Sequence, residues 1–398
     1  MRVAVLCNYP FPEGLAATTR IRTYLKGLAE IGVEVDVFVY NPTTAYCSDP
    51  KYPDNGSTEE GIQYHYPNGR KFGKSKLSRI IGIKLYNKIR TCYCIYRESK
   101  RKKIDFLFIA NDYLSLLYLA IPFCRLIRIA PIFITDEYPE PIRIFLKNKI
   151  PRWKKYAYNF ILLHVKGAVF MTESLERYFN LSGRIPTHVM PTITDTSRFS
   201  DCLQMPIERK YLCYMGNMEL SKDNVDNIIE AFARICDRYP KVDLHLYGAP
   251  AAADRMKIKT LIVRKELSTR VFLKGRVDFF MVPNILYNAT ILVSSQPDTK
   301  RAEGGFPTKL GEYLATGKPV LLTDVGEISR YIQNEVHAYI VPPEDPEAYA
   351  VALSQILDNY ASALAVGETG RKYLYNTFDY RIISRNLLRF LNRVKNGN

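Results

Sequence analysis

The sequence lacks the cysteine and histidine patterns that mark metal sites and disulfide-linked proteins. Its eight cysteines are scattered and only Cys92 and Cys94 lie close together, so we expect neither a zinc site nor a disulfide framework. The five histidines, at positions 65, 164, 188, 245 and 337, show no ligand spacing. Internal repeats and low-complexity tracts are also missing. We therefore expect no metal ion and no cofactor.

A long apolar run is missing as well. The best candidate for a membrane span, Tyr113–Ile134, is interrupted by Pro122, Arg125 and Arg128, so it is better explained as a buried helix and strand. We expect no leader peptide before the first apolar run, VAVLC at residues 3–7. The sequence therefore predicts a cytoplasmic protein.

Positive charge is in excess, and most of it lies in the first half of the chain. The net charge of +16 divides into +13 for residues 1–190 and +3 for residues 191–398. Thirteen basic residues and one acid, Glu98, fall between Arg70 and Lys103, and a second basic cluster spans Arg143–Lys155. Such a patch suits nucleic acid, an anionic lipid surface or an acidic substrate.

Part of this excess lies on a basic amphipathic helix predicted over residues 77–97. An apolar stripe with helical spacing is bordered there by arginine and lysine. Two interpretations are open: the helix lies in a membrane interface, or it packs on its own sheet with a solvated basic edge. The stripe consists of Leu77, Ile81, Leu85, Ile89, Tyr93 and Tyr96.

The order of apolar runs and amphipathic segments predicts two α/β domains. A chain of 398 residues is too long for one ordinary core and suits two domains of roughly 190 residues each. In both halves the runs alternate as strand, helix and strand, which is typical of doubly wound parallel sheets. We place the domains at 1–195 and 205–375, joined near Pro191–Arg209, where turn formers gather. The predicted strands are 3–7, 33–40, 105–109, 131–135, 168–171, 187–190, 210–215, 242–247, 271–274, 290–294, 319–323 and 338–341, and the clearest helices are 18–31, 224–238, 254–267 and 346–358.

The stretch Arg301–Asp324, RAEGGFPTKLGEYLATGKPVLLTD, is the most informative in the chain. We interpret it as a glycine-rich loop, a short helix and a buried strand. Gly304 and Gly305, followed by Phe306, would give the loop conformations that a side chain forbids. Pro307 suits the first helical turn, and Gly317 closes the helix.

The start of this predicted helix suits an anion. The amides of Thr308, Lys309 and Leu310 would be unpaired, and the helix dipole and the lysine charge would add to the attraction. Glu312 lies one turn beyond Thr308, on the same helix face. A carboxylate there is well placed to accept hydrogen bonds from a ribose diol. An ordinary α/β loop and amphipathic helix is the alternative.

This stretch resembles the donor-binding signature of the family-four retaining glycosyltransferases of the GT-B fold, in the form P-T-K-L-x-E-Y-L-A-x-G-K-P-V. The resemblance implies two tandem Rossmann-like domains facing a cleft. A nucleoside-diphosphate sugar would bind mainly to the second domain, and a last helix, 379–395, would pack back on the first. It also implies metal-independent transfer with retained anomeric configuration. The matching positions are Pro307, Thr308, Lys309, Leu310, Glu312, Tyr313, Leu314, Ala315, Gly317, Lys318, Pro319 and Val320.

Further donor-site residues follow from the resemblance. Gly216 and Lys222 occupy places where the family has a glycine and a lysine that binds the leaving diphosphate, but Asn217 stands where arginine is common. Lys300, Arg301 or Lys309 would then have to compensate for the missing charge. A helix-start lysine that faces solvent is the alternative for Lys222.

A base-binding turn and a sugar-binding acid complete the predicted donor site. Gly275, Arg276 and Val277 follow a strand where the family binds the base through its backbone, whereas Gly248 is better explained as a turn needed by the fold. Glu303 lies nine residues before Glu312 rather than the family's eight, so either the loop carries one extra residue or the role of the first acid is absent. We assign Glu303 to the donor sugar.

The first domain would hold the acceptor. Asp136, in TDEYPEPIR at 135–143, is the candidate for orienting or deprotonating an acceptor hydroxyl, and with Lys222 and Glu303 it completes the predicted catalytic set. A surface acid cluster is the alternative. The loop with Gly14, Ala16 and Ala17 after the first strand would approach the acceptor or the donor phosphate, although a plain β–α turn explains it equally.

These observations predict a retaining glycosyltransferase that acts on a lipid-linked or saccharide acceptor in cell-surface polysaccharide biosynthesis, peripheral to the inner face of the membrane. Its expected partners are the nucleotide sugar, that acceptor and an anionic membrane surface. A nucleotide-sugar epimerase of the same fold, a basic nucleic-acid-binding protein and a non-catalytic sugar-nucleotide sensor are the rivals. The motifs of nucleic-acid binders are not apparent in the sequence.

Overall fold

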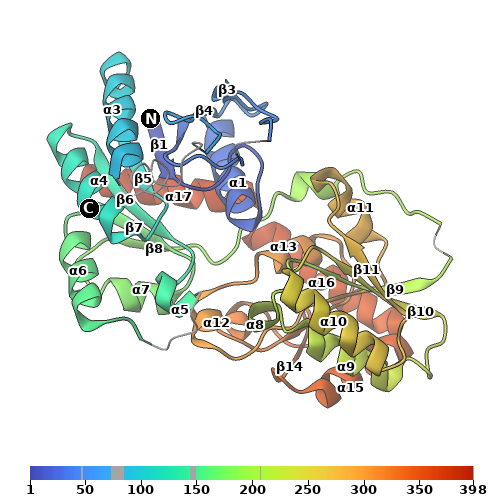
Figure 1. Ribbon diagram of the computed structural model, residues 1–398. Helices are drawn as coiled ribbons and strands as arrows, with labels where there is room; N and C mark the ends of the chain where they lie inside the picture. The colour runs from blue at the N-terminus through green and yellow to red at the C-terminus, as the bar shows by residue number, and fades with distance from the viewer. Residues whose placement is uncertain (46–47, 73–84, 144–148, 207, 398) are drawn as a thin grey trace. The chain divides into compact units, whose positions relative to one another are not determined.

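A computed structural model describes residues 1–45, 48–72, 85–143, 149–206 and 208–397 of the chain (Figure 1). Its contacts divide the chain into two units. The first comprises Met1–Ile193 and Tyr380–Asn398, and the second comprises Thr194–Asp379. Both are built on sheets of mainly parallel strands, which confirms the predicted α/β class.

The first unit contains an eight-stranded sheet in the order β3-β4-β2-β1-β5-β6-β7-β8. All its neighbouring strands are parallel except the pair β3–β4. Its central strands are buried on both faces, which explains their continuous apolar sequences. The strands are β1 (Arg2–Cys7), β2 (Glu34–Val39), β3 (Asn55–Ser57), β4 (Gln63–His65), β5 (Phe106–Ile109), β6 (Ala130–Thr135), β7 (Gly167–Phe170) and β8 (Thr187–Val189).

The helices of the first unit include the last helix of the chain. Figure 1 shows α17, in red, beside the blue α1, and the two helices are in contact. On this sheet α4 contacts both α3 and α6. The predicted segment 77–84 lies outside the described residues. The helices are α1 (Ala16–Glu30), α3 (Asn87–Arg101), α4 (Leu114–Leu126), α5 (Glu140–Arg143), α6 (Arg152–Leu162), α7 (Glu173–Phe179) and α17 (Tyr380–Asn396).

The second unit contains a six-stranded parallel sheet in the order β11-β10-β9-β12-β13-β14. The strands are β9 (Lys210–Met215), β10 (Val242–Tyr247), β11 (Val271–Gly275), β12 (Ile291–Val293), β13 (Val320–Thr323) and β14 (Tyr339–Val341). Its helical segments are η2 (Thr196–Phe199), α8 (Leu220–Asp223), α9 (Val225–Ile235), α10 (Ala252–Arg264), η3 (Phe279–Met281), α11 (Val282–Tyr287), α12 (Lys300–Gly304), α13 (Thr308–Ala315), α14 (Ile328–Tyr331), α15 (Pro346–Asp358) and α16 (Tyr360–Thr377).

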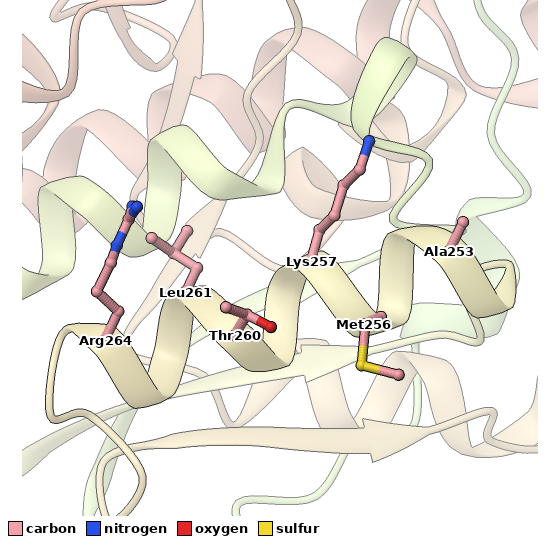
Figure 2. A pocket seen from close by; sticks show the side chains of 6 residues that line it. All are labelled: Ala253, Met256, Lys257, Thr260, Leu261 and Arg264. Carbon is pink, nitrogen blue, oxygen red and sulfur yellow. The ribbon is translucent and has the colours of Figure 1, made fainter.

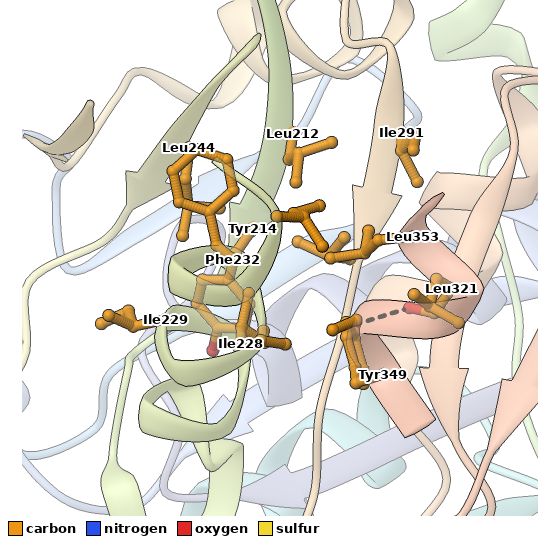
Figure 3. Packing of buried hydrophobic residues seen from close by; sticks show 14 of the residues in the cluster. Leu212, Tyr214, Ile228, Ile229, Phe232, Leu244, Ile291, Leu321, Tyr349 and Leu353 are labelled. Atoms are coloured by element: carbon orange, nitrogen blue, oxygen red, sulfur yellow. Dashed lines mark hydrogen bonds between the residues drawn. The ribbon is translucent and has the colours of Figure 1, made fainter. Parts of the chain in front are cut away.

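The core of the second unit joins α9 and α15 to the sheet. Figure 3 shows Phe232 of α9 and Leu353 of α15 among the side chains of the central strands. The hydroxyl of Tyr349 donates a hydrogen bond to the carbonyl of Leu321 over 3.1 Å, which satisfies a polar group inside this apolar cluster.

Each sheet has a point where the direction of winding reverses. In the first unit the chain passes from β1 to β2 and later returns to β5 on the other side of β1. In the second unit it passes from β9 to β10 and β11 and returns to β12. Ligands of doubly wound folds bind outside the carboxyl ends of the strands at this reversal, so these two edges are where the candidate sites are expected.

Candidate functional site

Three glycines line the carboxyl edge of the second sheet, and we call them the glycine edge. Gly216, Gly248 and Gly275 lie at the ends of the neighbouring strands β9, β10 and β11. The amide of Gly216 donates to the carbonyl of Tyr247 over 3.0 Å, and the amide of Gly248 donates to the carbonyl of Gly275 over 2.8 Å. Because glycine has no side chain of its own, a bound molecule could approach the backbone of these strand ends closely.

Close packing of the strand ends requires glycine at position 248. Its φ is +140°, and a Cβ atom at this position would lie 1.7 Å from the carbonyl oxygen of Gly216. Gly275, at φ +76°, faces open space. Arg276 after it is exposed and Val277 is half-buried.

Lys309 of α13 reaches the glycine edge at Gly216. A Cβ atom at Gly216 would lie 2.8 Å from the Lys309 Nζ. The same ammonium group donates to Asp223 Oδ1 over 2.8 Å and to the hydroxyl of Tyr214 over 3.0 Å. The lysine predicted to bind phosphate is thus ion-paired with the buried Asp223, a partner that no sequence pattern indicated.

The two charges of this pair stabilise each other against burial. Burial lowers the pKa of Lys309, and the opposing charge of Asp223 only partly offsets it. Burial by itself would raise the pKa of Asp223, but the charge and hydrogen bond of Lys309 outweigh it, and the pKa is lowered. Lys222 of α8 also lowers both pKa values, so it lies within electrostatic range of the pair.

The cations expected to compensate for Asn217 pair with acids. Arg301 Nη1 lies 2.7 Å from Glu219 Oε1, and Lys300 Nζ lies 2.6 Å from Glu303 Oε2. Glu303, the predicted sugar-binding acid, is therefore held by a neighbouring lysine. Asn217 itself is exposed.

The segment before α13 differs from the predicted glycine-rich loop. Residues Lys300–Gly304 form the short helix α12, whose start is capped by the Thr299 hydroxyl accepting from the amide of Ala302. Gly304 is thus helical, and Gly305 at φ −102° is extended in a way that any residue can adopt. The prediction that both glycines adopt backbone conformations that a side chain would forbid is therefore wrong. Phe306 is buried and packs edge-on against Tyr331.

Helix α13 begins after Pro307, as its sequence predicts. The amide of Leu310 donates to the carbonyl of Pro307 over 3.0 Å, so the expectation that it is unpaired is wrong. The amides of Thr308 and Lys309 remain the candidates for an anion at this helix start. Tyr313 fixes the helix to the sheet, because its hydroxyl accepts from the amide of Met215 over 2.8 Å.

Glu312 lies on α13 beside a second unpredicted partner. Its Oε1 accepts from Nη1 of Arg198 in η2. The guanidinium of Arg198 also donates to the carbonyl of Phe279 over 3.0 Å and lies 3.7 Å from the centre of the Phe279 ring. The predicted ribose-binding acid is therefore an ion-paired carboxylate with a fixed neighbour.

The carboxyl edge of the first sheet carries acids instead of glycines. Asp136 follows β6, and its Oδ1 accepts from Arg20 Nε over 3.0 Å. Arg20 is buried and also donates to the carbonyls of Met190 and Pro191. Asp136 is thus positioned by Arg20 of α1.

Asp112 joins this edge and was not predicted. Arg143 lies 3.4 Å from Asp112 Oδ1 and 3.4 Å from Glu137 Oε2. Burial raises the pKa of Asp112, and the charge of Arg143 only partly opposes that rise. Glu137 and Glu140 raise the pKa further, and Asp112 follows β5, next to the winding reversal of the first sheet.

The loop predicted after β1 is shorter than expected. Helix α1 begins at Ala16, so Ala16 and Ala17 belong to its first turn. Gly14 packs on Thr18, whose hydroxyl donates to the carbonyl of Pro10 over 2.7 Å, and a Cβ atom at Gly14 would lie 2.8 Å from the Thr18 Cβ. Close packing of this turn therefore accounts for Gly14.

Two hollows in the described part of the chain lie among the helices of the second unit. One of about 470 Å³ is lined by α10 alone, and Figure 2 shows Lys257, Leu261 and Arg264 extending from the same side of that helix. A second of about 380 Å³ lies between α9 and α10. A surface lined by one helix is too open to orient a substrate, so we place the candidate site at the strand ends.

Two features are absent from the part of the chain that the structure describes. None of its helices combines the length and the apolar character of a membrane span. No three histidine, cysteine, aspartate or glutamate side chains there gather as a metal site requires.

Comparison with known proteins gives a family match within the second unit. Residues 209–359 match the family described as glycosyl transferases group 1. Over 172 residues the chain is 27% identical to a D-inositol 3-phosphate glycosyltransferase from Corynebacterium urealyticum, in an alignment that covers 42% of this chain and 39% of the relative. The chain thus spans about two fifths of the length of that curated relative.

Solved structures match over the whole length of the chain. Sucrose-phosphate synthase from Thermosynechococcus elongatus has a TM-score of 0.76 at 17% identity, with 100% of both chains covered. Anabaena HepE in complex with UDP and glucose has a TM-score of 0.70 at 13% identity, covering 98% of this chain and 99% of that one. The fold is thus the GT-B fold that the sequence predicted, and together with the match over residues 209–359 it supports a glycosyltransferase.

Proposed function

We propose that the protein is a retaining glycosyltransferase that moves a sugar from a nucleoside-diphosphate sugar to an acceptor hydroxyl without a metal ion. The observation that carries the proposal is the convergence of Gly216, Lys309 and Lys222 at the carboxyl edge of the second sheet. HepE, a protein of the same fold, was solved with UDP and glucose, which favours a uridine nucleotide as the donor.

The charges at the glycine edge suit a leaving diphosphate. Lys309 can donate three hydrogen bonds, and Asp223 and Tyr214 accept two of them, which leaves one for a phosphate oxygen. Lys222 would supply a second positive charge. Fixed cations at the place where negative charge develops lower the barrier, because they need no reorganisation during the reaction.

Transfer assays with two substitutions test this site. We expect Lys222→Ala to lower kcat by about 100-fold or more, since one electrostatic donor at a developing charge is worth that much. Glu312→Ala should lower kcat/KM by about tenfold or more through loss of a charged hydrogen bond to the ribose. Lys259→Ala, an exposed lysine of α10, is the matched control and should change neither value. Near-normal turnover of both site variants would refute the assignment.

The acceptor is the less defined substrate. We propose a lipid-linked saccharide of cell-surface polysaccharide assembly, with Asp136 orienting its hydroxyl. The names of the relatives favour a second candidate, a soluble phosphorylated sugar or polyol. Transfer of radiolabelled sugar from UDP-glucose to a bacterial lipid extract, compared with transfer to inositol phosphate and to fructose phosphate, separates the two. An isomerised nucleotide sugar formed without any acceptor would instead favour the epimerase.

An exposed aromatic surface supports attachment to a membrane. On α6 the side chains of Trp153, Tyr156 and Phe160 are exposed at helical spacing. Tyr118 of α4 donates to the carbonyl of Ala157, which joins this row to α4 and through it to α3. The exposed part of the predicted stripe consists of Leu85, just before α3, and of Ile89, Tyr93 and Tyr96 on α3. We call these exposed side chains of α3, α4 and α6 the aromatic face.

The charges around the aromatic face favour an anionic lipid surface. Arg90 and Arg97 of α3 and Arg152 and Lys155 of α6 are exposed beside the apolar side chains. Aromatic rings between basic groups suit the headgroup level of a bilayer, where the rings meet the acyl chains and the cations meet phosphate. The buried side of α3, with Cys92 and Ile95, is the one that packs in the unit.

Co-sedimentation with liposomes tests this part of the proposal. Vesicles with phosphatidylglycerol should bind the protein, and vesicles of phosphatidylcholine alone should bind it less. Trp153→Ser with Phe160→Ser should weaken binding by about tenfold, whereas Met256→Ser with Val263→Ser, two equally exposed apolar side chains of α10, should not. Equal effects of the two pairs, or concentration-dependent dimerisation through the aromatic face, would refute it.

A further inference from the structure

Arg198 connects two parts of the second unit that lie far apart in the sequence. Its Nη1 pairs with Glu312 on α13, and its Nη2 donates to the carbonyl of Phe279, the first residue of η3. The ring of Phe279 covers one face of the guanidinium, 3.7 Å from its central carbon. Only 14% of the arginine side chain is exposed. Three contacts of different kinds thus hold one side chain in one place.

The short helix that carries Arg198 is itself fixed. The carboxylate of Asp195 accepts from the amide of Ser197 over 3.2 Å at the start of η2. The hydroxyl of Thr196 donates to Asp379, and Phe199 is buried. Arg198 is therefore a preorganised donor and not a surface arginine that samples many rotamers.

We propose that Arg198 is the positioning residue for the donor's ribose. It rests on the proposed function, in which Glu312 accepts hydrogen bonds from the ribose diol. Arg198 engages Oε1 of Glu312 and holds the carboxylate in one orientation. Among the described residues no hydrogen bond reaches Oε2, so this oxygen is available to the ribose.

The second contact of Arg198 extends this role to the base. Phe279 begins η3, two residues after Val277. Val277 is the last residue of the turn that is expected to hold the base through its backbone. By binding the carbonyl of Phe279 and the carboxylate of Glu312 together, Arg198 fixes the distance between the base-side turn and the ribose-side helix. Loss of Arg198 should therefore weaken recognition of the nucleoside more than recognition of the phosphates.

Binding of paired nucleotides tests this inference. Calorimetry would compare UDP, GDP and ADP with their 2′-deoxy counterparts on wild type, Arg198→Ala and Arg198→Lys. For the base that wild type prefers, we expect the ribonucleotide to bind about tenfold or more tightly than the deoxynucleotide, as a hydrogen bond to a charged group implies. Arg198→Ala should reduce this ratio to within about threefold, and Arg198→Lys should restore only part of it.

A matched pair elsewhere in the same unit provides the control. Arg238 lies 2.7 Å from Asp358, and Arg238→Ala should leave the ribose ratio at its wild-type value. An unchanged ratio in Arg198→Ala, with thermal unfolding as in wild type, overturns the positioning role. Tighter nucleotide binding by Arg198→Ala overturns it too, since Arg198 would then block the site. If wild type binds none of the six nucleotides, it is the proposed function that fails.

Discussion

The two units share one plan and differ in what stands at the carboxyl edge of the sheet. In the second unit three strands end in glycine, and cations lie beside the backbone with acids as partners. In the first unit the corresponding edge carries Asp112 and Asp136, each held by an arginine. The same scaffold thus presents two different sets of chemical groups. Bare backbone with nearby lysines suits a diphosphate, and oriented carboxylates suit a hydroxyl.

The buried acids of the two edges show this difference in their ionisation. Asp223 has the ammonium of Lys309 at 2.8 Å, and its pKa is lowered. Asp112 reaches Arg143 only at 3.4 Å and lies near other acids, and its pKa is raised. The first acid is stabilised as an anion inside the protein, whereas burial of the second favours its neutral form.

The largest expected effect comes from neutralising these two acids in turn. Asp223→Asn should lower the free energy of unfolding by about 3 kcal/mol, because it leaves the buried Lys309 charge without its partner. Asp112→Asn should change it by less than about 1 kcal/mol, since an amide avoids the cost of burying a charge. Denaturant unfolding followed by circular dichroism at pH 7 measures both. Equal losses would mean that the two edges do not differ in the way described.

Glycine substitutions sharpen the comparison of the backbones. Gly248→Ala should destabilise the protein by about 2–3 kcal/mol, because its Cβ would collide with the Gly216 carbonyl and its φ is strained. Gly32 has φ +83°, and a Cβ atom there would meet no atom within 4 Å, so Gly32→Ala should lower the free energy of unfolding by only about 1 kcal/mol through strain alone. Thermal unfolding of both variants separates the collision from the strain. A milder effect at Gly248 would show that the glycine edge can move.

The smallest expected effect concerns one histidine in each unit. Burial, and then the charge of Arg393, lowers the pKa of His188 to about 4, and burial, and then Lys274, lowers that of His245 to about 4. The unfolded chain takes up these protons near pH 6.5. The stabilisation is therefore complete above about pH 6.5 and is lost as the pH falls toward 4, by about 1–3 kcal/mol per histidine.

Replacing each histidine by phenylalanine should remove its share of this loss. His188 stacks on Phe390 and His245 stacks on Tyr211, so a phenyl ring can take the place of either imidazole. The free energy of unfolding, measured from pH 7 to pH 4, should then fall less steeply for each variant than for wild type. An equally steep fall in the variants would assign the acid sensitivity to other groups.

The sequence predicted the sheets better than the helices between them. Every predicted strand is present, because a parallel strand buried on both faces leaves a continuous apolar run. The short strands β3 and β4 leave no such run. Helix α16 was also missed, and its glycines explain why: a Cβ atom at Gly367 would lie 2.4 Å from the Gly317 carbonyl, and one at Gly370 would lie 2.2 Å from the His337 carbonyl. Close packing requires glycine there, and local sequence reasoning takes glycine as a helix breaker.

The candidate site could be located from the sequence, but its ion pairs could not. The motif around α13 and the glycines after the strands point to one edge of one sheet. The partners of Lys309 and Glu312 lie 86 and 114 residues away along the chain, and no local pattern encodes such a distance. Asp223 directly follows the predicted Lys222, and Arg198 falls in the predicted join between the two domains.

The position of α17 in the chain has a consequence for synthesis. This helix buries Leu387, Phe390 and Leu391 in the first unit, where the Ser384 hydroxyl donates to the carbonyl of Tyr24 on α1. A ribosome makes it only after the whole second unit has been synthesised. The unit that begins first is therefore completed last. Until then the apolar surface on which α17 packs is exposed to chaperones and to misassembly.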